Sequence, residues 1–237
     1  MLQNRWERPV GVGLCSGARR CIPMRMTDSQ SPTPDRRTQF LKIARRRFVL
    51  DGYARTPVSA IVREAGVAQG TFYLYFKGKQ GLLTELRREV FRDYARTLAE
   101  ESQRGCPADE RLARVVVSMV DAVARNLDLE RVFRHAESAE ATLRVVRDGR
   151  SRLAQTAAIF LEDGASSGVF QLEDPRRIAG FIVTLFDHIL YEAWVYEPES
   201  IDRVLAESLR FVLMGVGVGP DRVASLVTAS ARWRASR

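Results

Sequence analysis

Residues 52–82 read GYARTPVSAIVREAGVAQGTFYLYFKGKQGL, and their pattern predicts two short helices joined by a tight turn. The first of these helices has Thr56 as its expected N-cap and Pro57 in its first turn. Gly66 is expected to end it, because glycine accepts the positive φ that such a turn requires. The second helix, over residues 68–74, carries side chains that can hydrogen-bond to phosphates and base edges. This arrangement is typical of a helix-turn-helix that binds DNA.

A further helix is expected directly upstream, beginning at Pro34 with Thr33 as its N-cap and ending at Gly52. Its apolar residues fall on one helical face, as expected for the remaining member of a small three-helix domain. They are Phe40, Ile43, Ala44, Phe48 and Val49.

The same stretch resembles the DNA-binding domain of the tetracycline-repressor (TetR) family of bacterial regulators over residues 36–86. The residues that carry the resemblance are Gly52, Tyr53, Thr56, Val58, Ile61, Ala65-Gly66-Val67, Gly70-Thr71, Tyr73, Phe76, Lys79 and Leu82. Three departures from the family pattern are Pro57, Ala68 and Gln80-Gly81. Ala68 stands where the family usually has a Ser that caps the recognition helix. Losing that cap should cost about 1 kcal/mol of local helix stability.

The resemblance and side-chain chemistry together assign roles in the recognition helix. Gln69 can pair with adenine, Gly70 allows a close approach, and the methyl group of Thr71 can meet a thymine in the major groove. Phosphate contacts are implied at three positions where family members make them, Tyr73, Tyr75 and Lys79. The full set expected to contact DNA is Arg45, Thr56, Gln69, Gly70, Thr71, Tyr73, Tyr75, Lys77 and Lys79.

Two further expectations concern the same region. Thr56 can offer its hydroxyl or nearby helix-terminal amides to a phosphate. Phe72 and Phe76 are instead expected to pack inside the small domain, because large apolar side chains favour the interior.

Positive charge is concentrated in this part of the chain. Residues 36–81 contain ten Lys and Arg and two acidic residues, and the whole chain of 237 residues has a formal net charge of +8. A solvated face is the simpler interpretation of a run such as Arg45-Arg46-Arg47. Its coincidence with the helix-turn-helix favours phosphate binding.

The composition of the whole chain, 46% hydrophobic and 28% charged, is that of an ordinary folded protein. The three cysteines, Cys15, Cys21 and Cys106, have no metal-ligand spacing, and their odd number argues against a disulfide framework. We therefore expect no metal, no cofactor and a reducing cytoplasmic location.

The first residues differ in character from the rest. The apolar stretch of residues 10–14 is too short for an export signal, so neither export nor membrane insertion is expected. Because a polar segment follows Met24 and Met26, translation is expected to start at one of them, which would leave residues 1–23 untranslated. The alternative is a basic arm that adds phosphate contacts.

After Leu82 the apolar residues repeat with helical spacing and without strand-like alternation, so the expected fold class is all-α. Helices are expected over 80–103, 108–126, 128–147 and 150–164, with a break at Asp148-Gly149 and a loop over 163–175. Two long amphipathic helices follow. The expected domains are a disordered tail (1–33), the helix-turn-helix domain (34–80), a helical ligand-binding and dimerisation domain (81–218) and a C-terminal tail (219–237).

The two amphipathic helices near the C-terminus each present an apolar stripe. These stripes would also suit the core of a single chain, but the resemblance implies that they pair with their copies in a four-helix dimer interface. A dimer reads two half-sites about 34 Å apart, which adds their binding energies. The expected interface residues are Ile178, Phe181, Ile182, Leu185, Ile189, Trp194, Ile201, Val204, Leu205, Leu209 and Val212.

The resemblance also implies a ligand pocket between the helix-turn-helix and the dimerisation helices. Its expected lining is Phe91, Tyr94, Met119, Val120, Val123, Phe133, His135, Phe160 and Phe186, with Asp121, Asp187 and His188 as polar anchors. A plain core would hold similar residues. The expected function is a homodimeric repressor that binds a palindromic operator and is released by a small lipophilic effector; an activator or dual regulator is the alternative.

An enzyme is not expected. The segment Gly164-Ala165-Ser166-Ser167-Gly168 matches the pattern around a hydrolase nucleophile, here Ser166, but it follows a helical segment where that motif requires a strand. A helical protein that never touches DNA is disfavoured by the charge distribution.

Overall fold

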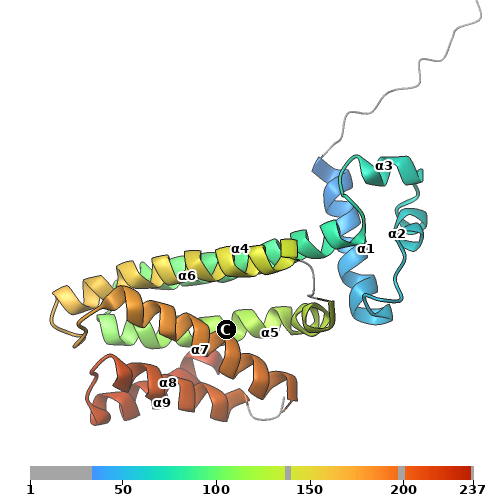
Figure 1. The fold of residues 1–237 in the computed structure, drawn as a ribbon. Helices are drawn as coiled ribbons and strands as arrows, with labels where there is room; N and C mark the ends of the chain where they lie inside the picture. The colour runs from blue at the N-terminus through green and yellow to red at the C-terminus, as the bar shows by residue number, and fades with distance from the viewer. Residues whose placement is uncertain (1–33, 137–139, 197–200, 236–237) are drawn as a thin grey trace, which may run out of the picture. The chain divides into compact units, whose positions relative to one another are not determined.

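This computed structural model describes residues 34–136, 140–196 and 201–235. These residues form nine α-helices and no strands (Figure 1). The helices are α1 Pro34–Asp51, α2 Val58–Ala65, α3 Gln69–Tyr73, α4 Lys79–Ser102, α5 Ala108–Ala136, α6 Glu140–Ser166, α7 Pro175–Tyr196, α8 Ile201–Gly215 and α9 Pro220–Ala235. The all-α prediction is confirmed. None of these helices is long and apolar enough to cross a membrane.

The first three helices close around a small aromatic core. Phe40 of α1 and Phe72 of α3 meet edge to face, with ring centroids 5.3 Å apart, and Phe48 and Ile61 are fully buried beside them. Gly66 ends α2 with a φ of 66°, in the left-handed region that the sequence predicted. This packing holds α2 and α3 on either side of the tight turn.

Thr56 does not cap α2, contrary to the prediction. The N-cap is Pro57, which makes no side-chain capping bond. The Thr56 hydroxyl is buried and donates to the carbonyl oxygen of Gly52 at 2.9 Å. Thr56 therefore satisfies a carbonyl at the end of α1 instead of an amide at the start of α2.

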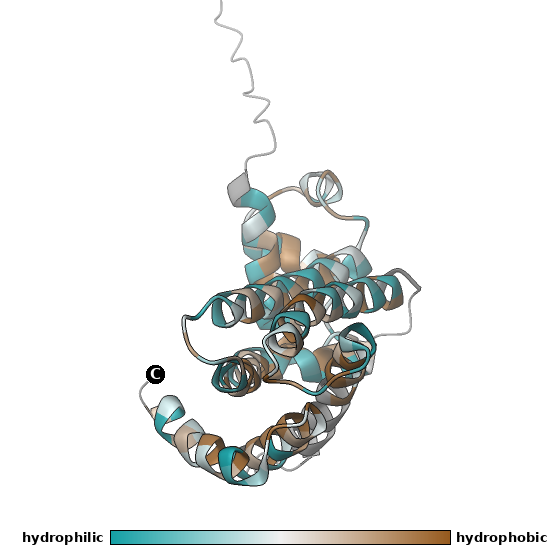
Figure 2. Ribbon diagram, turned by 90° about the vertical axis from the view of Figure 1, so that its left-hand side faces the viewer, coloured by the Kyte–Doolittle hydropathy of each residue, from teal (hydrophilic) through white to brown (hydrophobic). Residues whose placement is uncertain are grey.

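Helix α4 joins the helix-turn-helix to the remaining helices. Its first turns bury Leu82, Leu83 and Leu86 completely, and the same apolar cluster continues to Tyr94 in its middle. The helices of the bundle carry both hydrophobic and hydrophilic residues along their length (Figure 2). Helix α4 belongs to both the helix-turn-helix domain and the bundle. A shift of its axis in the bundle therefore moves its end in the helix-turn-helix domain, and the reverse also holds.

Helices α5 and α6 are two continuous helices where the sequence predicted three shorter ones, over 108–126, 128–147 and 150–164. Gly149 does not break α6 but lies within it, because the ring of Phe91 on α4 packs against its α-carbon. A β-carbon at this position would lie 2.5 Å from Cγ of Phe91. Near the end of α6, Gly164 is similarly covered by Phe170, so α6 extends to Ser166 into the predicted loop. Tertiary packing thus explains glycines that looked like helix breakers.

The C-terminal segment is a helix and not the predicted tail. Helix α9 buries Val223 and Leu226 in a cluster with α5 and α8, and the ring of Trp233 lies 4.1 Å from the guanidinium of Arg114 on α5. Arg222 pairs with Asp109 at the start of α5, with 2.6 Å between Nε and Oδ2. Val223 and Leu226, three residues apart, are buried both by the preceding helix α8 and by α5, which is distant in sequence.

Candidate functional site

Helix α3 exposes a short polar face. Gln69, Gly70 and Tyr73 are exposed and Thr71 is half-buried, while Phe72 between them is fully buried. No atom lies within 4 Å of where a β-carbon on Gly70 would stand, so that surface is open to a partner. The burial of Phe72 therefore turns the predicted base-contacting residues outward.

The other aromatic residues near α3 divide between interior and surface. Phe76 is buried, with its ring 6.3 Å from that of Phe40, which confirms the interior packing expected for Phe72 and Phe76. Tyr75 is half-buried, with its ring 5.9 Å from Phe40. Lys77 is exposed next to it. Tyr75 can reach a partner only with its polar end.

Lys79 holds the loop between α1 and α2. Its ammonium donates to the carbonyl oxygens of Tyr53 and Ala54 and lies 4.3 Å from the centre of the Tyr53 ring. Burial lowers the pKa of Lys79. An ammonium has three donors, so one remains for a phosphate while two stabilise the loop.

The run Arg45-Arg46-Arg47 faces other helices of the protein. Arg46 and Arg47 both pair with Glu64 on α2. Arg45 donates to the carbonyl oxygen of Arg125 and to Oδ1 of Asn126 on α5, each at 3.4 Å. The structure therefore does not bring Arg45 together with the exposed face of α3. Spacing along α1 could not show this, because the partners are distant in sequence.

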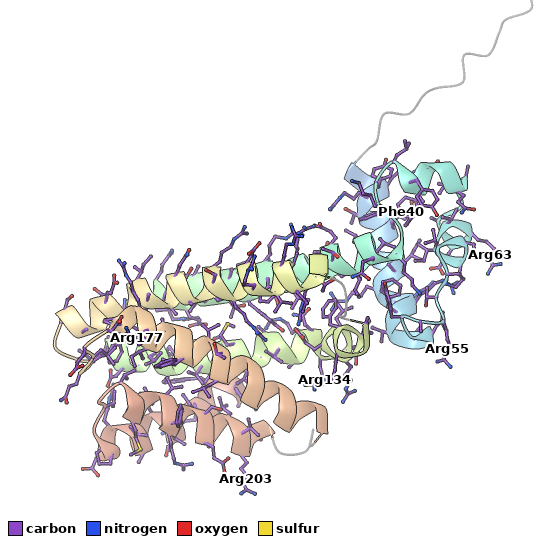
Figure 3. All side chains as sticks on the ribbon, in the orientation of Figure 1. Phe40, Arg55, Arg63, Arg134, Arg177 and Arg203 are labelled. Carbon is purple, nitrogen blue, oxygen red and sulfur yellow. The ribbon has the colours of Figure 1, made fainter. Side chains whose placement is uncertain are left out.

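Two further arginines point outward from the helix-turn-helix (Figure 3). Arg63 lies on the exposed side of α2, and Arg55 follows α1 with its Nε donating to the carbonyl oxygen of Asp51 at 2.7 Å. Neither is among the predicted DNA contacts. Arg55 and Arg63 could have been added to the predicted DNA contacts, because both belong to the basic stretch of residues 36–81.

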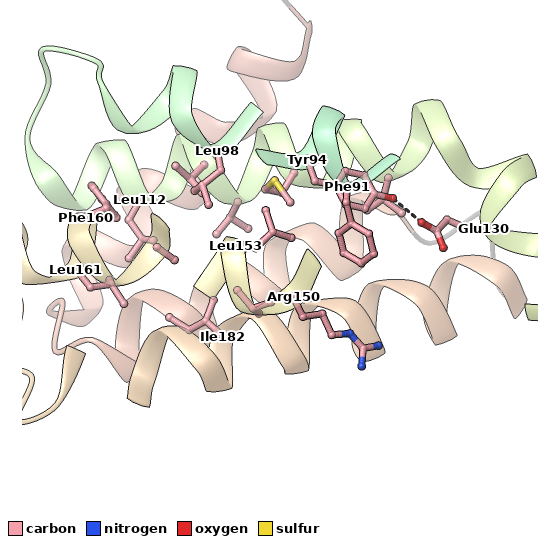
Figure 4. A pocket seen from close by; sticks show the side chains of 16 residues that line it. Phe91, Tyr94, Leu98, Leu112, Glu130, Arg150, Leu153, Phe160, Leu161 and Ile182 are labelled. Carbon is pink, nitrogen blue, oxygen red and sulfur yellow. Dashed lines mark hydrogen bonds between the residues drawn. The ribbon is translucent and has the colours of Figure 1, made fainter. Parts of the chain in front are cut away.

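A mostly apolar cavity of about 90 Å³ lies among α4, α5, α6 and α7 (Figure 4). Five of the predicted lining residues do line it: Phe91, Tyr94, Met119, Val123 and Phe160. The lining residues that the sequence did not predict are Leu98, Leu112, Val115, Val116, Glu130, Arg150, Leu153, Ala157, Leu161, Ile182 and Val183.

Of the other predicted lining residues, two lie in the core and two have side chains outside the described residues. Val120 and Phe133 are fully buried in the core and do not line the cavity. The side chains of His135 and Phe186 lie outside the described residues, as do the proposed anchors Asp187 and His188. Asp121 pairs with Arg234 of α9, with 3.1 Å between Oδ1 and Nε.

Two charged residues, Glu130 and Arg150, line the cavity instead. Oε1 of Glu130 accepts a hydrogen bond from the Tyr94 hydroxyl at 2.8 Å, and Oε2 accepts one from Arg87 at 2.5 Å. The guanidinium of Arg87 also lies 4.5 Å from the centre of the Phe133 ring. The charge of Glu130 is therefore compensated by a group on α4, the helix that continues from the helix-turn-helix.

The predicted dimer residues also divide between surface and interior. Leu205, Leu209 and Val212 are buried within this chain, in the cluster formed with α5 and α9, and do not offer a dimer surface. Ile182 lines the cavity, and Ile178 and Val204 are half-buried. The side chains of Ile189, Trp194 and Ile201 lie outside the described residues.

Among the side chains that the structure describes on α7 and α8, the exposed large apolar residues are Phe181 and Leu185, both predicted, and Phe211 and Met214, which the sequence did not predict. Phe181, Phe211 and Met214 are each more than half exposed. Spacing alone did not separate the two faces of α8, because both carry apolar residues.

Ser166 does not stand in the strand-to-helix turn that the hydrolase motif requires. It is the last residue of α6, and its hydroxyl donates to the carbonyl oxygen of Glu162 at 2.8 Å. A nucleophile of the pattern expected here would stand between a strand and a helix. Of the two glycines in the pattern, Gly164 is covered by Phe170 and Gly168 has a φ of 73°.

Comparisons with known proteins agree with this geometry. Residues 40–86 match a family model described as bacterial regulatory proteins of the tetR family, and residues 105–191 match a tetracyclin repressor-like C-terminal domain. The uncharacterized HTH-type regulator YdgC of Bacillus subtilis is 32% identical over 189 residues, which cover 76% of this chain and 92% of YdgC. The regulator AcrR of Shigella flexneri is 27% identical over 70% of this chain and 81% of its own length.

Among solved structures, FadR of Bacillus subtilis in complex with stearoyl-CoA has a TM-score of 0.63 and 25% sequence identity. The similarity covers 77% of this chain and 98% of that protein. The helix-turn-helix, the helical bundle behind it and these relatives lead to one conclusion. The chain belongs to the TetR family of bacterial transcriptional regulators.

Proposed function

We propose that this protein is a cytoplasmic homodimeric repressor, which binds a palindromic operator through α3 and leaves it when a small lipophilic effector enters the cavity. The observation that carries the proposal is that α4 belongs to both sites. Lys79 at its start fixes the loop between α1 and α2 of the helix-turn-helix domain, and Phe91, Tyr94 and Leu98 further along it line the cavity.

The DNA part of the proposal rests on the exposed face of α3. Gln69 presents an amide that suits adenine, Gly70 leaves room for the base edges, and Thr71 carries a methyl group that suits thymine. Tyr73 and Lys77 are exposed beside them and suit phosphates. A helix of five residues spans only a few base pairs, so specificity requires a second half-site and hence a second subunit.

The dimer part rests on the exposed apolar residues of the last helices. Phe181 and Leu185 on α7 and Phe211 and Met214 on α8 would leave a large apolar surface in water if the chain were a monomer. A second copy would cover the same residues with its own, as a two-fold interface does.

The effector part rests on the size and lining of the cavity. At about 90 Å³ it is smaller than the roughly 300–1,000 Å³ that sites for drug-sized ligands occupy. A ligand of that size must therefore widen the space between α4 and its neighbours, and it binds the widened form better. That difference in affinity is what shifts a two-state protein. The stearoyl-CoA bound to the FadR relative supports a lipophilic ligand.

Fluorescence anisotropy of a labelled duplex from the DNA upstream of this gene tests the proposal. We expect binding that resists random competitor DNA and weakens as salt rises, because phosphate contacts release counterions. Gln69→Ala and Tyr73→Ala should each weaken it about tenfold. Arg176→Ala, a change of an exposed arginine on α7, is the matched control and should leave it unchanged. Binding that random DNA removes equally for every genomic fragment would refute operator recognition.

A further inference from the structure

A second hollow, a groove of about 300 Å³, follows the contact between α4 and α6. Its lining residues on α4 are Arg88, Phe91, Arg92 and Ala95, and those on α6 are Val145, Asp148, Gly149 and Arg152. Both sets have the spacing i, i+3, i+4, i+7, so each belongs to one helical face and the two faces oppose each other. We call this hollow the α4–α6 groove.

The α4–α6 groove is basic. It has three arginines, Arg88, Arg92 and Arg152, and one carboxylate, Asp148, which pairs with Arg147 outside the groove. The side chains of Arg88 and Arg92 are 52% and 64% exposed. Exposed guanidinium groups that line one groove are suited to an anion with several oxygens, such as phosphate.

Phe91 separates this groove from the apolar cavity, since it lines both. Its ring packs against the α-carbon of Gly149. A side chain at residue 149 would clash with the ring in this position. A change in the orientation of this one side chain would connect the basic groove to the apolar cavity. The apolar cavity therefore lies on one side of the Phe91 ring and the basic α4–α6 groove on the other.

We propose that the effector is an amphiphile whose phosphate group binds Arg88, Arg92 and Arg152 in the α4–α6 groove and whose apolar chain passes Phe91 into the cavity. This inference rests on the proposed function, because it names the chemical class of the effector. The apolar chain displaces the Phe91 ring and so adds the space of that ring to the small cavity. The phosphate stays near solvent, which avoids the cost of burying its charge.

The headgroup site shares a carboxylate with the helix-turn-helix. Arg88 and Arg92 both pair with Glu85, at 3.1 Å each, and Glu85 also accepts Arg37 of α1 at 3.0 Å. Burial by itself would raise the pKa of Glu85, but the hydrogen bonds from these three arginines lower it. A phosphate competes with Glu85 for Arg88 and Arg92 and so changes the contact that ties α1 to α4. Effector binding at the groove is thereby linked to the position of the helix-turn-helix.

Isothermal titration calorimetry of the full chain without DNA tests the inference. It measures the affinity for three probes, which are octyl phosphate, octanol and inorganic phosphate. We expect octyl phosphate to bind at least about tenfold more tightly than either of the others, because only it offers both parts. Arg92→Gln and Arg152→Gln should each weaken octyl phosphate about five- to tenfold and leave octanol unchanged. Arg96→Gln is the matched control, since this arginine of α4 pairs with Asp93 and does not line the groove.

A variant that fills the cavity tests the other half of the site. Ala157→Leu adds apolar volume to the cavity wall and should weaken octyl phosphate about fivefold without affecting inorganic phosphate. Equal affinity for octanol and octyl phosphate, or arginine variants that bind like the parent chain, would overturn the inference. A chain that binds its operator but not octyl phosphate would refute this inference alone. Operator binding is measured separately by anisotropy, so the two failures are distinguishable.

Discussion

Arg87 of α4 and Glu130 of α5 form a buried ion pair, with 2.5 Å between Nη1 and Oε2 and side-chain exposures of 9% and 6%. Removing one partner of a buried pair leaves the other charge uncompensated, which typically costs about 3–5 kcal/mol. We expect Arg87→Met to lower the free energy of unfolding by about that amount, as measured by urea denaturation. Arg203→Met, which breaks the exposed pair with Glu207, should cost less than about 1 kcal/mol. Equal effects of the two changes would show that the buried pair does not hold α4 to α5.

Neighbouring residues of α3 should separate stability from DNA binding. Phe72 is fully buried, so Phe72→Ala should cost about 3–5 kcal/mol of stability. Tyr73 is 55% exposed, so Tyr73→Ala should change stability by no more than about 0.5 kcal/mol while weakening operator binding. Thermal unfolding and DNA anisotropy on both variants check this. A Tyr73 variant that unfolds as readily as the Phe72 variant would contradict the assignment of faces on α3.

Charge placed on the exposed apolar residues of α7 and α8 should dissociate the proposed dimer. Phe181 and Phe211 are 56% and 58% exposed in this chain, so Phe181→Glu or Phe211→Glu disturbs little within it and buries an uncompensated carboxylate only in a dimer. Sedimentation velocity should detect monomers. Ile159→Glu, at an apolar residue of α6 that is 69% exposed, is the control and should leave the dimer intact. A dimer that survives both phenylalanine changes would place the interface elsewhere.

Gly149 should be intolerant of alanine although it lies inside a helix. Alanine normally stabilises a helix interior by up to about 1 kcal/mol over glycine. Here the new β-carbon would stand 2.5 Å from Cγ of Phe91, so Gly149→Ala should lower the melting temperature. At Gly81 of α4 the nearest atom would be Cβ of Phe76 at 3.8 Å, an ordinary contact, so Gly81→Ala should be neutral or stabilising. A stabilised Gly149 variant would mean that the Phe91 ring moves away without cost.

The ion pair between Asp109 and Arg222 should make stability depend on acid. The hydrogen bond from Arg222 lowers the pKa of Asp109. A depressed folded-state pKa stabilises the fold above the ordinary carboxylate pKa of about 4, and this contribution is lost as pH falls through the folded-state value. Asp109→Asn should therefore lower stability at pH 7 and flatten its decline below about pH 4. Melting curves at several pH values measure both effects. If stability falls with pH in the same way in the Asp109→Asn variant, the pair with Arg222 does not contribute to holding α9 on α5.

The local features of the helix-turn-helix could be predicted because neighbouring residues produce them. Gly66 ends α2 through its own backbone freedom, and Phe72 alternates with exposed residues at helical spacing. The helical character of α7, Pro175–Tyr196, also follows from its own apolar period. These properties depend on contacts within a few turns of one helix.

Apart from the Thr56 cap, the errors arose where partners are far apart in the chain. The interruption predicted at Gly149 was wrong because Phe91, on another helix, needs that space. Leu209 was assigned to a dimer surface but packs on the chain's own α5 and α9. Arg45 was assigned to phosphate but faces Asn126.

Sequence alone thus determined that the chain is all-α, that its basic N-terminal helices form a helix-turn-helix, and which residues of α3 differ in polarity. Periodicity and turn chemistry are local, and they suffice for these conclusions. The tertiary structure alone decided which face of each bundle helix is internal, that α9 docks, and that Glu130 and Arg150 line the cavity. An amphipathic pattern shows that a helix has a buried face but does not name the helix that covers it, because that choice depends on packing among all the helices at once.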